Sequence, residues 1–351
     1  MVSSLLHEKP GSPASLPTNR ESPSFMVISK AMGKLRVLLI GCGDVALRTA
    51  RLLTPTFRLY GLTRNPDQYS SLRAAGITPI AGDLDVHRTL GRLAVDPFAV
   101  LHFAPPPSSG DDDPRTRNLL AALATPSRNR STPGRARSLP RVIVYISTTG
   151  VYGDSAGALI DETHPLAPAT TRAARRVAAE RRLRRACRRT FQEPVKLAIL
   201  RAPGIYAEDR LPIERLQRGM PALIDRDDVY TNHIHADDLA RATIAAMFRA
   251  KPQRAYNVTD DAHWKMGEYF DRVADALALN RPPRIPRDEA DRVIPPMMRS
   301  FMSESRRLSN ARICSELRWR PLHSTPQAML DRMREARTLA SIATAARRNT
   351  S

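Results

Sequence analysis

The sequence predicts an α/β fold in which a doubly wound parallel sheet is joined to a smaller C-terminal part. Short apolar runs alternate with helical patterns over residues 35–206, which is typical of such sheets. The first run, residues 37–40, is uninterrupted, as in a strand buried on both faces. Two glycines follow it, and helical spacing then resumes. At 351 residues, the chain is long enough to bury a large core.

Strands and helices are expected to alternate through residue 206. Strands are expected at residues 37–40, 57–63, 77–81, 98–103, 142–146 and 195–200. Helices are expected at residues 45–53, 70–75, 85–93, 114–123 and 171–190, with 125–140 as a loop rich in Ser, Pro and Arg. Further helices are expected at 239–247, at 264–279 and, broken by Pro295-Pro296, at 287–307.

The glycine turn after the first strand predicts a nucleotide site. Gly41 permits a tight turn, Gly43 lets backbone N–H groups approach a diphosphate, and Ala46 keeps the helix close to the strand. The first residues of the helix that follows are Asp44, Val45 and Ala46. Their unpaired N–H groups, together with the positive end of the helix dipole, face phosphates bound at the turn. A strand, a glycine turn and a helix in this order indicate dinucleotide binding of the Rossmann type. A glycine-rich turn without a ligand is the alternative.

The pattern divides the chain into segments. Residues 1–33 are expected to be a disordered leader, because they are rich in Pro and Ser and contain no continuous apolar segment of a secretory signal. Residues 34–206 are expected to form the nucleotide-binding domain, with 233–258 returning to the sheet. Residues 207–232 and 259–340 are expected to bind substrate, and 341–351 to be a tail.

The composition restricts the partners. The formal charge of +20 comes mostly from arginine, and the densest basic segments, 128–141 and 172–189, contain no aromatic residue. Nucleic acid is therefore not expected as a partner, because a stacking module is missing. No apolar run approaches the ~18 residues of a membrane helix. Three scattered cysteines fit a reducing, cytoplasmic compartment and no zinc pattern.

The end of the second strand bears on the choice of cofactor. Sites that prefer NAD place Asp or Glu near this point, to bind the ribose hydroxyl groups. This chain has Thr63 and Arg64 instead, and an arginine suits the 2′-phosphate of NADP. The sequence thus favours NADP over NAD, with a solvated loop arginine as the alternative.

From residue 34 onward, the chain resembles the extended or atypical short-chain dehydrogenase/reductase proteins of the NAD-dependent epimerase/dehydratase family. The resemblance depends on the order and spacing of motifs that are each weak alone. After the glycine turn these are Gly82-Asp83-Leu84, His102-Phe103-Ala104, Ser147-Thr148-Thr149-Gly150-Val151-Tyr152-Gly153, Arg201-Ala202-Pro203-Gly204-Ile205-Tyr206, His233-Ile234-His235-Ala236-Asp237-Asp238 and Tyr256-Asn257-Val258.

The resemblance implies roles for residues at the ends of strands. It implies that Asp83 and Leu84 line an adenine pocket, that Ala104 and Pro105 pack along the cofactor, and that Pro203 flanks the nicotinamide. It also implies a small-molecule substrate and leaves open whether the protein forms a homodimer. Asp83 has a simpler alternative, which is to cap the element that follows it.

The resemblance places the chemistry at a Tyr-x-x-x-Lys pair, and here this sequence departs from the family. Counted from the neighbouring motifs, the Tyr position is Arg172 and the Lys position is Arg176. A guanidinium stays protonated, so Arg172 cannot exchange a proton as a phenol does. Arg176 can still bind a ribose or a phosphate. The nearest alternative groups are Thr148, at the position that bonds a substrate oxygen, and Tyr152, for which an aromatic side chain packed in the core is the simpler interpretation.

Three functions therefore stay open. One is an NAD(P)-dependent oxidoreductase or epimerase with another proton donor, acting on a small carbonyl or a nucleotide-sugar-like molecule. The second is a non-catalytic NAD(P)-binding module that senses redox state. The third is an anion site made by Arg172, Arg175 and Arg176. The alternative for these three arginines is a solvated basic helix face without a ligand.

No metal site is expected. His233 and His235 precede Asp237 and Asp238, but strand alternation puts the two histidines on one face with no acidic ligand set by the spacing. The two aspartates are expected to begin the helix that follows.

Overall fold

The computed structural model describes residues 34–93, 95–124, 139–190 and 194–349. Its centre is a seven-stranded sheet in the order β11-β7-β5-β4-β1-β2-β3, in which every neighbouring pair is parallel. The strands are β1 (Arg36–Ile40), β2 (Arg58–Thr63), β3 (Ile77–Ala81), β4 (Ala99–His102), β5 (Val142–Thr148), β7 (Lys196–Ala202) and β11 (Arg254–Asn257). The predicted doubly wound parallel sheet is confirmed.

The direction in which the chain adds strands reverses at β1. The chain first runs outward through β2 and β3, and then returns to place β4, β5 and β7 on the other side. Ligands of such sheets bind at the carboxyl ends of the strands where this reversal occurs. Here those ends belong to β1 and β4, which lead directly into Gly41 and Ala104.

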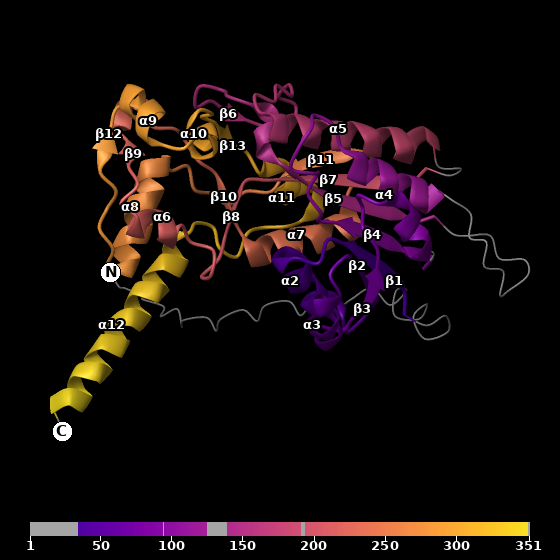
Figure 1. Cartoon of the computed structure of the whole chain (residues 1–351), viewed down its shortest axis with the longest axis horizontal. Helices are drawn as coiled ribbons and strands as arrows, with labels where there is room; N and C mark the ends of the chain where they lie inside the picture. Colours follow the sequence, from indigo (N-terminus) through magenta and orange to yellow (C-terminus); the bar gives the residue numbers. More distant parts are fainter. Residues whose placement is uncertain (1–33, 94, 125–138, 191–193, 350–351) are drawn as a thin grey trace, which may run out of the picture.

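Alternation along the strands builds two apolar layers. Val37 and Leu39 of β1 join one core, and Leu38 and Ile40 join the other; all four side chains are fully buried. One face is covered by α2 (Asp44–Leu53), α3 (Tyr69–Ala74), α7 (Ala236–Arg249) and α11 (Ala311–Leu317). The other is covered by α4 (Pro114–Ala124), α5 (Thr171–Arg185) and the 3₁₀ helix η2 (His87–Leu93), and Figure 1 shows the two layers on either side of the sheet.

The smaller part lies to one side of the sheet (Figure 1). It contains α6 (Ile213–Gln217), α8 (Met266–Leu277), α9 (Arg287–Val293), α10 (Pro296–Met302) and the long α12 (Gln327–Asn349). Three pairs of short strands complete the fold: β6 (Leu159–Ile160) with β13 (Arg307–Leu308), β8 (Gly204–Tyr206) with β10 (His233–His235), and β9 (Ala222–Leu223) with β12 (Arg284–Ile285).

Several segments differ from the expectation. Residues 87–93 form a 3₁₀ helix, and the helix expected to end at residue 190 changes at Ala186 into a π-helical turn. Within 233–258, only β11 joins the main sheet, because β10 pairs with β8 instead. The predicted tail at 341–351 begins inside α12. The expected leader, 1–33, and residues 125–138 of the expected loop lie outside the described residues.

Two kinds of feature are absent from the described residues. No helix among them has both the length and the apolar character to span a bilayer. No group of three or more His, Cys, Asp or Glu side chains in the same set is arranged to bind a metal ion.

Candidate functional site

Gly41 is required by the packing of the turn. Its φ of +86° lies in the left-handed region, and a Cβ added there would come within 2.7 Å of the backbone nitrogen of Ala104. The same nitrogen donates a hydrogen bond to the carbonyl oxygen of Ile40 at 2.9 Å. The ends of β1 and β4 are thus in direct contact at the tight turn that the glycine pattern predicts.

Gly43 has a different role, because the backbone there is extended and a Cβ would meet nothing within 4 Å. No side chain caps α2, so the first N–H groups of the helix, from Asp44, Val45 and Ala46, are left for another partner. Ala46 itself is fully buried and lets α2 pack against the sheet. Open space before an uncapped helix N-terminus fits a diphosphate.

Two arginines not named so far, Arg48 and Arg210, bind the acidic residues beside this turn. The Asp44 carboxylate accepts hydrogen bonds from Arg48 at 2.8 Å and from Arg210 at 2.9 Å, and Arg48 also binds Asp237 at 2.7 Å. Although partial burial opposes ionisation, these two arginines lower the pKa of Asp44. The i, i+4 spacing of Asp44 and Arg48 in the sequence is enough to predict an ion pair on one helix face. The contact of Arg210 with Asp44 could not be predicted in this way, since 166 residues separate the two in the chain.

Arg64, Asp83 and Leu84 come together at the carboxyl ends of β2 and β3. Arg64 is 67% exposed, and its Nη1 lies 3.8 Å from a carboxylate oxygen of Asp83 and 3.9 Å from one of Asp85. Asp83 accepts a hydrogen bond from the backbone nitrogen of Asp85 at 2.9 Å, which stabilises the turn that precedes η2. Leu84 is buried. Within the described part of the chain, Arg64 is therefore an exposed side chain held only by two long ion pairs.

Ala104, Pro105 and Pro203 lie at the ends of other strands. Ala104 and Pro105 follow β4, and the carbonyl oxygen of Pro105 accepts a hydrogen bond from Arg115 at 3.2 Å. Pro203 joins β7 to β8 and is half-buried. All three residues thus follow the carboxyl ends of central strands, on the side of the sheet where Gly41 lies.

Thr148 and Tyr152 differ sharply in their surroundings. Thr148 ends β5 and is half-buried, and its hydroxyl oxygen accepts a hydrogen bond from the Gly150 nitrogen at 3.4 Å. Tyr152 is fully buried, with its hydroxyl held between Asn257, at 2.7 Å, and Arg201, at 2.9 Å. Burial raises the pKa of Tyr152 to about 12. This geometry favours a packed aromatic residue over a proton donor.

Arg172 and Arg176 lie one helical turn apart at the start of α5. Nη1 of Arg176 donates to the carbonyl oxygen of Ile146 at 2.7 Å and to the hydroxyl of Tyr145 at 3.1 Å, so this side chain reaches β5. Arg172 instead places its guanidinium carbon 4.2 Å from the ring centroid of Phe301, on α10.

The two histidines at β10 have structural partners. The His235 ring accepts a hydrogen bond from the backbone nitrogen of Asp237 at 3.2 Å, and it stacks on His323 with centroids 3.7 Å apart. His233 stacks on Tyr269 at 4.1 Å, and burial lowers its pKa to about 3. Asp237 and Asp238 lie in the first turn of α7, as expected.

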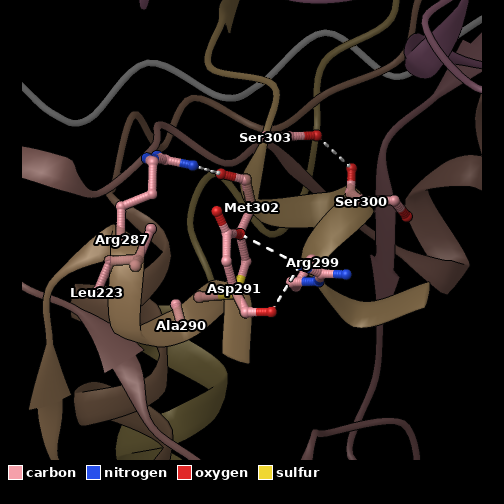
Figure 2. A pocket seen from close by; sticks show the side chains of 8 residues that line it. All are labelled: Leu223, Arg287, Ala290, Asp291, Arg299, Ser300, Met302 and Ser303. Atoms are coloured by element: carbon pink, nitrogen blue, oxygen red, sulfur yellow. Dashed lines mark hydrogen bonds and ion pairs between the residues drawn. The ribbon is translucent and has the colours of Figure 1, made fainter. Parts of the chain in front are cut away.

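A separate cavity of about 180 Å³ lies in the C-terminal part between α9 and α10 (Figure 2). Arg287 donates to the carbonyl oxygen of Met302 at 3.0 Å, and Arg299 donates to that of Asp291 at 2.7 Å. These bonds hold α10 against α9. None of the predicted cofactor residues lines this cavity.

Comparison with known proteins agrees with this geometry. The model of the NAD-dependent epimerase/dehydratase family matches residues 47–259. A conserved protein of unknown function from Silicibacter pomeroyi is 31% identical, with a TM-score of 0.70 over 86% of this chain and 99% of that one. A search of curated proteins found no match.

Two enzyme structures share the fold at lower identity. One is a dTDP-glucose 4,6-dehydratase from Bacillus anthracis in complex with NAD, 15% identical, with a TM-score of 0.66 over 86% of this chain and 96% of that one. The other is a UDP-glucose 4-epimerase from Thermotoga maritima with UDP-glucose, 15% identical, with a TM-score of 0.64 over 86% and 99%. The family match covers more than half of the chain and includes six of the seven strands of the main sheet, all but β1. The chain therefore belongs to the NAD-dependent epimerase/dehydratase family.

Proposed function

We propose that this protein is an NAD(P)-dependent oxidoreductase or epimerase/dehydratase that acts on a small carbonyl compound or a nucleotide-sugar-like molecule. The observation that carries the proposal is the open space at Gly43, before an uncapped helix where the strand order reverses. A diphosphate bound there accepts hydrogen bonds from the first N–H groups of α2 and is stabilised by the helix dipole.

The remaining roles follow from position. When bound, the nicotinamide cofactor supplies or accepts a hydride at the substrate carbon. The Thr148 hydroxyl donates a hydrogen bond to the substrate oxygen. Arg176 uses Nη1 to bind β5, which leaves Nε and Nη2 to hold the cofactor ribose. Pro203 packs beside the nicotinamide, and Ala104 and Pro105 pack along the cofactor.

Titration of the protein into NADH and NADPH, followed by nicotinamide fluorescence, tests the proposal. A saturable change with a micromolar dissociation constant is expected for at least one of the two. If neither binds up to millimolar concentrations, the proposed function is wrong, and so is any sensing role.

A second function is a redox-sensing module that binds NAD(P) without turnover. It is favoured by the lack of a suitable proton donor at the Tyr position of the family motif. Arg172 stands at the Tyr position and Tyr152 is enclosed, so neither group is suited to exchange a proton at neutral pH. A panel of aldehydes and nucleotide sugars with NAD(P)H distinguishes the two functions. Turnover of any of them supports an enzyme. The double variant Arg172→Tyr, Arg176→Lys is expected to raise that turnover if the rest of the site is competent.

The preference for NADP is tested at Arg64. We expect Arg64→Ala to raise the dissociation constant of NADPH about tenfold, because one charge-assisted hydrogen bond is worth roughly 1.5 kcal/mol. The dissociation constant of NADH should change less than twofold. Fluorescence titration of both cofactors measures this. Equal losses for the two would mean that Arg64 does not distinguish them.

A further inference from the structure

Three arginines at the start of α5 have different bonding in the structure. Nη1 of Arg175 donates a hydrogen bond to the carbonyl oxygen of Gly110, and that of Arg176 donates to the carbonyl oxygen of Ile146. Arg172 makes no hydrogen bond and no ion pair with the part of the chain that the structure describes. Of the three, Arg172 is the guanidinium left for an outside partner.

An aromatic ring covers one side of this guanidinium. Its carbon atom lies 4.2 Å from the ring centroid of Phe301, and α10, which carries Phe301, lies beside the start of α5 (Figure 1). Glu304 is near enough to act on the charge of Arg172, but its carboxylate binds Arg306 at 2.8 Å. Stacking leaves the N–H groups at the guanidinium edge available for bidentate bonding.

Arg172 also lies where substrate is expected. It precedes Arg176 by one turn on the same helix face, and Arg176 reaches the end of β5. The next helix residue, Ala173, lies beside Gly150, in the turn that follows Thr148. Arg172 is thus placed between the proposed reaction site and α10 of the smaller part.

We propose that Arg172 determines substrate specificity by binding a carboxylate of the substrate. This rests on the proposed function above. A planar guanidinium with one charge matches a carboxylate in geometry and charge. A phosphate ester carries up to two charges and calls for a second cation, whereas Arg175 is buried against Gly110 and Arg176 is assigned above to β5 and the cofactor ribose. The first turn of α5 has no acidic residue, and partial burial, with repulsion from Arg175 and Arg176, lowers the pKa of Arg172 even though the charge of Glu304 acts to raise it. A bound anion offsets both effects.

The test uses the full-length protein saturated with whichever cofactor binds, so a failure of the proposed function is seen before any substrate is added. Titration calorimetry then measures the affinities of UDP-glucuronate and UDP-glucose, which differ by one carboxylate, and of oxalate and inorganic phosphate. We expect UDP-glucuronate to bind at least tenfold more tightly than UDP-glucose. Arg172→Gln should remove that preference and weaken oxalate binding, while Arg172→Lys should keep part of both.

Arg181→Gln is the matched control, because Arg181 is an exposed arginine of the same helix. It should leave all four affinities unchanged, and every variant should bind the cofactor as the wild type does. The proposal is overturned if Arg172→Gln binds both UDP-glucuronate and oxalate as tightly as the wild type does, or if neither carboxylate binds. Phosphate binding that exceeds oxalate binding and depends on Arg172 would overturn the choice of a carboxylate.

Discussion

Gly43→Val is expected to raise the dissociation constants of NADH and NADPH at least a hundredfold while the protein stays folded. The added side chain occupies the space before α2 in which nothing lies within 4 Å, and thereby displaces the diphosphate from the helix N–H groups. Loss of two charge-assisted hydrogen bonds, at roughly 1.5 kcal/mol each, corresponds to a factor of about one hundred or more. Nicotinamide fluorescence measures the affinities.

The backbone conformation makes this variant informative. Gly43 has a φ of −82°, which any residue adopts, so the cost to stability should stay near the ~1 kcal/mol of a poorer helix cap. Gly91→Val is the matched control: a Cβ there also meets nothing within 4 Å, but Gly91 lies in η2 (His87–Leu93) and should leave the affinities unchanged. Normal cofactor binding by Gly43→Val would show that the diphosphate does not bind at this turn.

Glu180→Ala is expected to lower the free energy of unfolding by about 3–5 kcal/mol, because it leaves the charge of Arg201 buried without its partner. The two side chains are only 1% and 4% exposed and are joined at 2.8 Å. Glu180 also accepts a hydrogen bond from Ser147 at 2.6 Å. Burial alone would lower the pKa of Arg201, but the hydrogen bond and charge of Glu180 raise it. Urea denaturation measures the loss.

An exposed ion pair gives the comparison. Glu214 pairs with Arg218 at 2.6 Å, but the two side chains are 78% and 69% exposed, so Glu214→Ala should cost less than about 0.5 kcal/mol. If Glu180→Ala cost no more than Glu214→Ala, Arg201 would have to find water or another partner on losing Glu180. Cofactor affinity at low denaturant is a useful second measurement, because it reports on the site near β7. Arg201 also donates a hydrogen bond to Tyr152, and β7 leads to Pro203.

Local patterns carried enough information to predict the sheet and the glycine turn. Apolar runs buried on both faces, helical spacing between them and the order of motifs depend on residues close in the chain, so a reader of the sequence can place Gly41, Gly43 and Ala46. The same holds for the family, for the interrupted helix at Pro295-Pro296 and for Asp237 at the start of α7.

Packing decided the surroundings of several side chains of the proposed site. That Tyr152 is enclosed by Asn257 and Arg201, that Arg210 meets Asp44, and that Arg172 stacks on Phe301 depends on contacts between distant segments. Such contacts produce no periodic pattern in the sequence, because the surroundings of a side chain depend on which elements pack against it in the folded chain. Whether a guanidinium keeps donors for a ligand is therefore decided by the folded chain and not by the residue type.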